Sequence, residues 1–280
     1  MVYQFSLAPL VLHALYTQNG HFLTHWAQQL RPPALGCNFL NFIASHDGIG
    51  LRPVEGLLPE TEIANLIQGM RDQGGYISMR TQTDGSQVPY EINIALFSAC
   101  AQTQQGEDDF QVERFLCSQL IILTLQGLPA LYIHSLIASE NDQAGVELTG
   151  RTRSINRKKW PYDDINQRLN DPNSPQAQVL TQLKQALQQR RHCPAFHPDI
   201  DQKVIDLGKD FFIIWRGRQD LDAPLLAVFN LTPHSQTLDP SHIEDLPEII
   251  HWRDLLAQQQ FKYNTHWALA PYQVLWLVAE

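Results

Sequence analysis

The spacing of hydrophobic positions predicts a series of helices in the first part of the chain. After Pro59, apolar residues recur at 63, 66, 67 and 70, which is the period of a helix, and Gly74 ends it. The stretch 81–91 is polar and predicts a loop with a turn at Asp84 and Gly85. By the same criteria, helices are predicted over residues 7–30, 60–73, 92–103 and 108–125 and from 175 onward.

Two short runs are nearly continuously apolar and predict strands buried on both faces. The first, Phe39 to Ile43, leads into the polar residues His46 and Asp47. The second, Ala130 to Ile133, ends in the same way at His134. Strands that alternate with helices and end in polar residues are typical of a parallel α/β fold.

The pattern changes near Phe196 into short strands separated by glycine, proline, asparagine and aspartate. A small antiparallel β domain is therefore predicted, with strands in the segments KVIDLG, FFIIWRG, PLLAVFNLT, EIIHW and YQVLWLVA. The boundary lies between residues 195 and 200, which gives an α/β part over residues 1–197 and a β domain over residues 198–280.

The α/β part is too short for a complete barrel. A (β/α)8 barrel takes about 250 residues. Fewer than 200 residues precede the β domain, and the pattern predicts only two barrel-type strands among them. The α/β part is therefore either a smaller fold or the tail end of a larger one.

Composition and charge exclude several classes of protein. The chain is 44% hydrophobic and 18% charged, as expected of a soluble globular protein. A net charge of −9 argues against a nucleic-acid partner, which needs a basic surface. No apolar run is long enough to span a membrane, and residues 1–15, interpreted as a helix entering the core, lack the features of a signal peptide. The four cysteines have neither disulfide nor metal-site spacing, so a reducing, cytoplasmic location is expected.

Several motifs, taken together and in order, resemble a known family. They are FNFIASHDGIG, PYEIN, QGLPALYIHS, GRTRSINRKKW and LAPYQVLWL. They resemble the second half of sucrose-phosphorylase-like enzymes, members of the α-amylase superfamily that transfer glucose between phosphate and an acceptor. The resemblance covers residues 2–277. It implies the C-terminal portion of a (β/α)8 barrel followed by a small antiparallel β domain.

The resemblance gives His46 and Asp47 the central roles. Asp47 matches the aspartate at the end of the seventh barrel strand that stabilises the oxocarbenium-like transition state, and His46 matches the histidine that holds a hydroxyl of the glucosyl ring. A carboxylate at a strand's carboxyl end interacts more strongly as the sugar gains positive charge. From residue types alone, the segment Ser45 to Asp47 could simply turn the chain.

Five further residues are candidates for substrate contact. Arg153 matches the family's phosphate-binding arginine, and a guanidinium suits bidentate phosphate binding, although a solvated basic run is the alternative. Tyr90 and Glu91 lie on the loop that, by resemblance, rearranges between acceptor and phosphate binding. His134 could contact the acceptor from a strand end. Arg52 lies in the segment LRPVEGLLPE, which resembles glucosylglycerate and sucrose-phosphate phosphorylases; it could meet an anionic acceptor there or be a surface arginine.

Two catalytic carboxylates of the family have no counterpart in this sequence. Retaining glucosyl transfer requires a nucleophile and an acid/base, and by resemblance both belong to barrel strands upstream of the first helix. The chain is therefore expected to be inactive alone, as a truncated product, one half of a split enzyme or a silent remnant. An open half-barrel would expose strand edges and apolar surface, which predicts self-association or a separate N-terminal half-barrel chain as partner.

The predicted function is thus part of a retaining α-glucoside phosphorylase that acts on a sugar or sugar-phosphate substrate. Inorganic phosphate is its co-substrate, and neither a cofactor nor a metal is expected, since no ligand cluster has the required spacing. A hydrolase or transglucosidase of the same superfamily, which would need no phosphate arginine, is the alternative among enzymes. A carbohydrate-binding or partner-binding remnant is the alternative outside them.

Overall fold

The α/β part contains a three-stranded parallel sheet. The computed structural model describes residues 1–34, 36–217, 224–244, 246 and 251–280. The sheet has the order β1 (Val2–Tyr3), β2 (Phe39–Asn41), β8 (Leu128–Pro129). The sequence predicted two such strands; β1 was missed because two residues at the start of an apolar stretch show no strand period.

Helices surround this sheet and fill the space towards the second sheet. The long ones are α1 (Leu7–Thr17), α2 (His21–Gln29), α3 (Glu60–Asp72), α5 (Gln111–Thr124) and α9 (Pro175–His192). The shorter ones are α4 (Leu96–Ala99), α6 (Ile133–Leu136), α7 (Gln143–Thr149) and α8 (Tyr162–Asn170). Single 3₁₀ turns are η1 (Arg52–Val54), η2 (Thr152–Asn156), η3 (Pro194–Phe196) and η4 (Pro240–His242). None of the described helices is long and apolar enough to cross a bilayer.

The single helix predicted over residues 7–30 is wrong, because the chain breaks between α1 and α2. Gln18 adopts a left-handed conformation with φ 56°. The amide of Gly20 donates to the carbonyl of Lys209 at 2.6 Å, and a Cβ atom on Gly20 would lie 2.6 Å from Cδ1 of Leu231. Close approach to the C-terminal sheet therefore sets the break, and helical periodicity alone could not reveal it.

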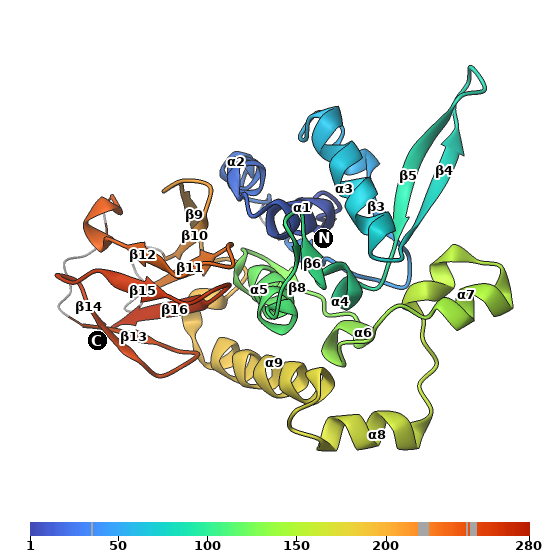
Figure 1. The fold of residues 1–280 in the computed structure, drawn as a ribbon. Coiled ribbons are helices and arrows are strands. Elements are labelled where there is room, and N and C mark those ends of the chain that lie inside the picture. Colours follow the sequence, from blue (N-terminus) through green and yellow to red (C-terminus); the bar gives the residue numbers. More distant parts are fainter. Residues whose placement is uncertain (35, 218–223, 245, 247–250) are drawn as a thin grey trace.

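The polar stretch predicted as a loop is instead the end of a β-hairpin that projects from the body (Figure 1). The turn at Asp84 and Gly85 is present, and Gly85 has a φ of 86°. Exposed strands carry few apolar residues, so their period was hidden. The hairpin pairs with a short third strand in the order β3 (Ile49–Gly50), β5 (Gln87–Asn93), β4 (Tyr76–Thr81).

Two further boundaries differ from the sequence prediction. The helix predicted over 92–103 is replaced by the end of β5, the short α4 and the hairpin of β6 (Gln102–Thr103) and β7 (Gly106–Glu107). The strand predicted over 130–133 is shifted to β8, and His134 lies in α6 rather than at a strand end. The predicted helix 108–125 corresponds well to α5.

The C-terminal part contains a six-stranded antiparallel sheet (Figure 1). The sequence predicted an antiparallel β domain here but did not predict the strands β12, β14 and β15. Residues 248–250 of the predicted strand EIIHW lie outside the described residues. The order is β14 (Gln260–Lys262), β13 (His251–Asp254), β16 (Val274–Ala279), β11 (Leu225–Asn230), β10 (Phe211–Arg216), β9 (Gln202–Ile205), and β12 (Gln236–Leu238) pairs separately with β15 (Trp267–Leu269).

One hydrophobic core joins the α/β part to this sheet. Phe229 and Trp276 belong to the same buried cluster as residues of α1, α5 and α9, whereas Val228 and Leu275 belong to a second cluster on the opposite face. Neighbouring residues along β11 and β16 thus face different cores, as the alternation of strand side chains requires. The division at residue 197 stays a prediction about the chain; the packing is continuous across it.

Candidate functional site

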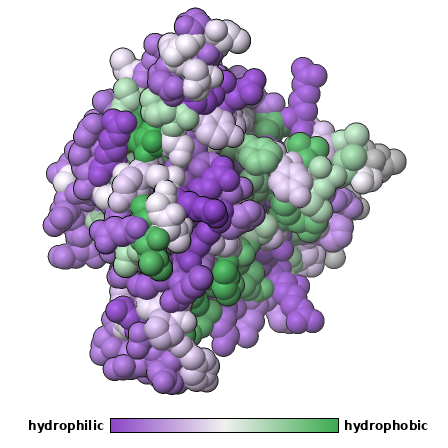
Figure 2. Space-filling view, turned by 90° about the vertical axis from the view of Figure 1, so that its right-hand side faces the viewer, coloured by the Kyte–Doolittle hydropathy of each residue, from purple (hydrophilic) through white to green (hydrophobic). Residues whose placement is uncertain are grey.

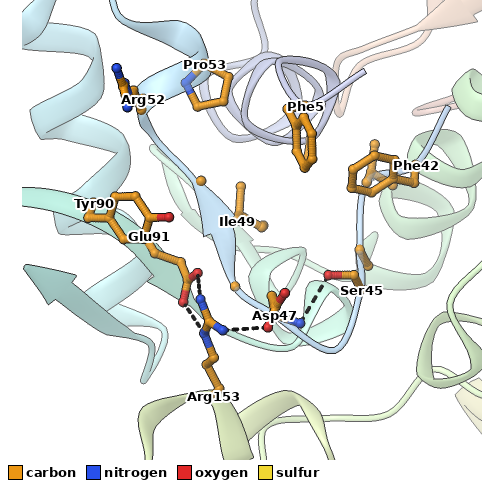
Figure 3. Close-up of a pocket in the computed structure, with 15 residues that line it drawn as sticks. Phe5, Phe42, Ser45, Asp47, Ile49, Arg52, Pro53, Tyr90, Glu91 and Arg153 are labelled. Atoms are coloured by element: carbon orange, nitrogen blue, oxygen red, sulfur yellow. Dashed lines mark hydrogen bonds and ion pairs between the residues drawn. The ribbon is translucent and has the colours of Figure 1, made fainter. Parts of the chain in front are cut away.

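A cavity of about 530 Å³ opens beside the parallel sheet (Figure 3). Polar side chains from β5, η2 and the loop after β2 form one side, and aromatic side chains near β1 and β2 form another. Of the seven predicted site residues, Asp47, Arg52, Tyr90, Glu91 and Arg153 line it. The other lining residues are Phe5, Ala8, Phe42, Ile43, Ala44, Ser45, Gly48, Ile49, Gly50 and Pro53.

Asp47 is held by its backbone, which leaves part of its carboxylate exposed to the cavity. Its amide donates to Oγ of Ser45 at 3.1 Å, and Nδ2 of Asn156 donates to its carbonyl at 2.7 Å. The side chain is 40% exposed. Asn156 was not predicted as a site residue, although it lies within one of the motifs that carry the family resemblance. It links η2 to the loop that carries Asp47.

Arg153 joins the two cavity carboxylates. Its Nε and Nη2 donate to the two carboxylate oxygens of Glu91 at 2.9 and 2.6 Å, and its Nη1 donates to Oδ1 of Asp47 at 2.7 Å (Figure 3). The hydrogen bonds that Arg153 donates to Glu91 are the main reason that the pKa of Arg153 is raised above its ordinary value. The sequence placed these three residues in one site but did not predict that they bind one another.

A second arginine and the predicted histidine lie at the edge of this cluster. Arg157 donates from Nε to the carbonyl of His46 at 2.6 Å and places Nη2 3.5 Å from Oδ1 of Asp47. His46 Nε2 lies 3.7 Å from Oδ2 of Asp47, and its side chain is 71% exposed. His46 is therefore beside Asp47, as the motif suggested, but it is not among the residues that line the cavity.

The glycine of the His-Asp-Gly motif has a steric role. A Cβ atom on Gly48 would lie 2.5 Å from Cγ of Glu91 and 2.6 Å from the carbonyl oxygen of Ile92. Contacts under 3.0 Å are essentially absent between real Cβ atoms and their neighbours. The absence of a side chain at Gly48 thus lets the Asp47 loop pack directly on the stem of Glu91.

Tyr90 and Arg52 lie on the side of the cavity formed by β3 and β5. Tyr90 is 41% exposed, and its carbonyl accepts the amide of Leu51 at 3.0 Å. Arg52 opens η1 at the cavity wall. Within the described part of the chain, its guanidinium has no hydrogen bond or ion pair, so it is available for an anion.

His134 is separated from the main cavity. Its Nδ1 lies 2.8 Å from Oγ of Ser139, which also accepts the indole N–H of Trp160 at 2.8 Å. Burial lowers the pKa of His134 below its ordinary value. His134 lines a small void of about 20 Å³, whose wall shares Asp47 with the main cavity. Direct contact between His134 and a ligand in the main cavity is therefore not provided by this arrangement.

The charged residues of the cavity suit the binding of a sugar with a nearby anion. They do not include both of the carboxylates that a retaining mechanism requires. That mechanism needs two carboxylates that both reach the scissile bond. Among the described cavity residues, Asp47 and Glu91 are the carboxylates, and both oxygens of Glu91 are already bound by Arg153. Only Asp47 has an oxygen directed to no arginine.

Curated relatives match nearly the whole chain, while no family model does. Glucosylglycerate phosphorylase of Escherichia coli is 37% identical over 277 residues, which are 99% of this chain and 48% of that protein. Sucrose phosphorylase of Bifidobacterium adolescentis is 26% identical, over 77% of this chain and 41% of that protein. The chain thus spans about half the length of the curated relatives it matches.

A solved structure confirms the fold class predicted from the sequence. Sucrose 6F-phosphate phosphorylase from Thermoanaerobacter thermosaccharolyticum superposes with a TM-score of 0.68 and 22% identity, covering 82% of this chain and 43% of that one. An AmyP variant in complex with maltotriose covers 97% of this chain and 49% of that one, with a TM-score of 0.54 and 14% identity. The α/β part and the antiparallel domain are therefore the C-terminal portion of a barrel and the domain that follows it.

Proposed function

Because the chain belongs to the sucrose-phosphorylase-like glycoside phosphorylases of the α-amylase superfamily, of which it spans about half, we propose that it supplies part of a phosphorolytic active site. The reaction is reversible transfer of glucose from an α-glucoside to phosphate, which yields glucose 1-phosphate. The observation that carries this proposal is the contact of Asp47 with Arg153 at the wall of a cavity large enough for a glucosyl ring.

In this reaction, Asp47 stabilises positive charge and does not form a bond. An external carboxylate attacks C1 of the glucosyl group, the C1–O bond to the leaving group breaks, and an external acid protonates the leaving oxygen. A phosphate oxygen then attacks C1, the bond to the carboxylate breaks, and the same external group accepts the phosphate proton. Oδ2 of Asp47, which no arginine contacts, is the oxygen that faces the developing charge.

Arg153 and Arg52 bind different anionic groups of the substrates. Arg153 contacts phosphate through N–H donors not used by Glu91 and Asp47, since a guanidinium has five and three are engaged. Arg52, with no partner among the described residues, meets an anionic acceptor such as glycerate. Tyr90 forms the wall on the acceptor side, His46 binds a hydroxyl of the glucosyl ring, and His134 shapes the region behind Asp47.

The missing carboxylates come from a complementary half-barrel, carried by the same or another polypeptide. Within the described residues, strand β1 pairs only with β2, and β8 lies at the opposite edge of the sheet. Residues at the β1 edge are strongly exposed for their type, with Tyr3 at 55% and Phe5 at 59%. An open parallel edge with apolar surface fits either another half-barrel or self-association.

A phosphorolysis assay tests the proposal. The chain is assayed alone and after assembly with the complementary half of a glucosylglycerate phosphorylase, with sucrose, sucrose phosphate and glucosylglycerate as donors. We expect glucose 1-phosphate only from the assembled pair, and its loss by at least 100-fold with Asp47→Asn. Asp163→Asn, an exposed aspartate in the first turn of α8, serves as the matched control and should leave the rate unchanged.

Each other outcome points to a different function. Phosphate-independent release of glucose indicates a hydrolase or transglucosidase of the same superfamily. Activity of the chain alone indicates a nucleophile within the 280 residues and overturns the division of roles given above. An assembled but silent pair indicates a carbohydrate-binding or partner-binding remnant.

A further inference from the structure

Glu91 is the most buried charged residue among those that line the cavity. Its side chain is 6% exposed, while those of Arg153 and Asp47 are 42% and 40% exposed. Both of its oxygens accept hydrogen bonds from Arg153 (Figure 3). A sugar hydroxyl could therefore reach Glu91 only if the bidentate pair opened, which makes direct substrate contact by Glu91 unfavourable.

The surroundings of Glu91 hold it in place from two sides. It lies on β5, the central strand of its sheet, opposite Gly50 of β3 and Ser78 of β4. The backbone of Gly48 packs on its side-chain stem without room for a Cβ atom. A carboxylate fixed this firmly can in turn fix the flexible arginine that binds it, because a bidentate pair defines the plane of the guanidinium.

We propose that Glu91 is a positioning residue that holds Arg153 by its Nε and Nη2 edge and so directs Nη1 to Asp47 and the unused N–H donors to the phosphate. This inference rests on the proposed phosphorolytic function. Without the anchor, the half-exposed Arg153 side chain would sample several rotamers, and phosphate binding would have to restrict them.

A substitution that removes the charge of Glu91 changes phosphate affinity in opposite directions under positioning and under simple repulsion. Glu91→Gln removes a negative charge near the phosphate, which by Coulomb's law alone would strengthen phosphate binding. If Glu91 positions Arg153, the same change weakens phosphate binding by about tenfold, the usual effect of losing a hydrogen bond to a charged group. Calorimetric titration of the full chain with inorganic phosphate measures the difference.

Two comparison variants make the result specific. Glu55→Gln makes the same change in net charge at a carboxylate that is 54% exposed and pairs with Arg80 outside the cavity, and it should leave phosphate affinity unchanged. Gly48→Ala alters no charged group but forces the stem of Glu91 to move, and it should weaken phosphate binding as Glu91→Gln does. If both variants weaken phosphate binding to a similar extent, a folding defect in one variant alone cannot explain the result.

A measurement without phosphate distinguishes failure of this inference from failure of the proposed function. The Arg153 Nε–H signal in a ¹H–¹⁵N spectrum, assigned with Arg153→Lys, should be protected from exchange, lost in Glu91→Gln and retained in Asp47→Asn. If native chain binds no phosphate, the phosphate role of Arg153 is wrong, and this signal still decides the role of Glu91. A signal retained in Glu91→Gln, or phosphate affinity that is unchanged or increased, overturns the proposal.

Discussion

The antiparallel sheet and the three-stranded parallel sheet differ in how completely other parts of the chain cover their residues and pair with their strands. Every residue of β11, at the centre of the antiparallel sheet, is 0% exposed, whereas Val2 and Tyr3 of β1 are 48% and 55% exposed. The antiparallel sheet has a hydrophobic cluster on each face. The parallel sheet ends, on the β1 side, in an exposed apolar strand that has no second neighbour among the described residues.

The backbone of β1 shows the same difference. The amides of Val2 and Gln4 donate to carbonyls of the β2 segment, at 2.8 and 3.1 Å. Alternate residues of a strand direct their amides to opposite sides, so the amide of Tyr3 faces away from β2. Around it, the rings of Tyr3, Phe5 and Phe42 lie within 6.1 Å of one another. The space-filling view likewise shows hydrophobic residues exposed between hydrophilic areas on one side of the molecule (Figure 2).

The difference shows that the most completely packed region of the chain is not the region that carries the candidate site. The antiparallel sheet, with a hydrophobic cluster on each face, and the helices against it form a core that can hold the chain folded. The open parallel sheet carries the loop with Asp47 and borders the candidate cavity. The site residues therefore lie next to the region whose packing is least complete.

The largest effect is expected where the two regions share a core. Trp276 of β16 is fully buried, its indole N–H donates to Oγ1 of Thr124 at 2.9 Å, and its ring lies 4.6 Å from that of Phe196. Trp276→Ala should lower the free energy of unfolding by about 3–5 kcal/mol. Urea denaturation followed by circular dichroism measures it.

The control for this prediction is Tyr162→Ala, whose side chain is 78% exposed on α8 and which should change the free energy by less than about 0.5 kcal/mol. A loss confined to the β domain, with an unchanged helical transition, would show that the two regions unfold separately and that the shared core does not couple them.

An intermediate effect is expected from acid, with opposite signs in the two regions. His13 of α1 is 1% exposed, and burial lowers its pKa although Glu62 opposes this. The folded state then takes up the His13 proton less readily than the unfolded state. The free energy of unfolding is therefore highest above about pH 6.5. As the pH drops below that value, it decreases by at most about 1.4 kcal/mol per pH unit for one proton. Burial instead raises the pKa of Asp254 in β13, so acid relieves the penalty of its charge.

Urea denaturation from pH 7.5 down to pH 4 sharpens this contrast. His13→Gln should flatten the loss of stability on acidification, while Asp254→Asn should steepen it, because it removes a carboxyl group whose protonation favours the folded state. Equal slopes for native chain and His13→Gln would show that His13 remains able to take up a proton in the folded state.

The smallest effect on stability is expected at the exposed strand edge. Replacing Tyr3 and Phe5 together with serine should change the free energy of unfolding by less than about 1 kcal/mol, because both side chains are more than half exposed. Self-association of the chain should nevertheless decrease, since the apolar edge is its expected contact. Sedimentation velocity over a range of concentrations measures this, and an unchanged distribution would place the contact elsewhere.

The sequence predicted most of what depends on local period and motif. The apolar stripes gave α3 and α5, and the strand segments gave most of the antiparallel sheet. Five of the seven predicted site residues line one cavity. Their mutual contacts could not be predicted, because Asp47, Glu91 and Arg153 meet only through the packing of three separate elements.

The wrong secondary-structure predictions arose where a local sequence pattern was absent or where a distant contact decided the structure. Residues 81–91, the outer part of the hairpin of β4 and β5, lack the apolar alternation of a half-buried strand, so they were predicted as a loop. The break between α1 and α2 depends on Gly20 meeting the sheet at Lys209, which no local pattern records. His134 follows an apolar run that is too short to distinguish a strand from an extended turn before a helix.

The contact between Gly20 and Lys209 also constrains the order of assembly during synthesis. One partner lies near the beginning of the polypeptide and the other in its last third, so the helices α1 and α2 cannot complete their packing until the β9–β10 segment has left the ribosome. Contacts of such large sequence separation slow folding and prolong the exposure of apolar surface. The apolar faces of α1 and α2 therefore stay uncovered for longer during synthesis than those of helices that pack against neighbouring segments of the chain.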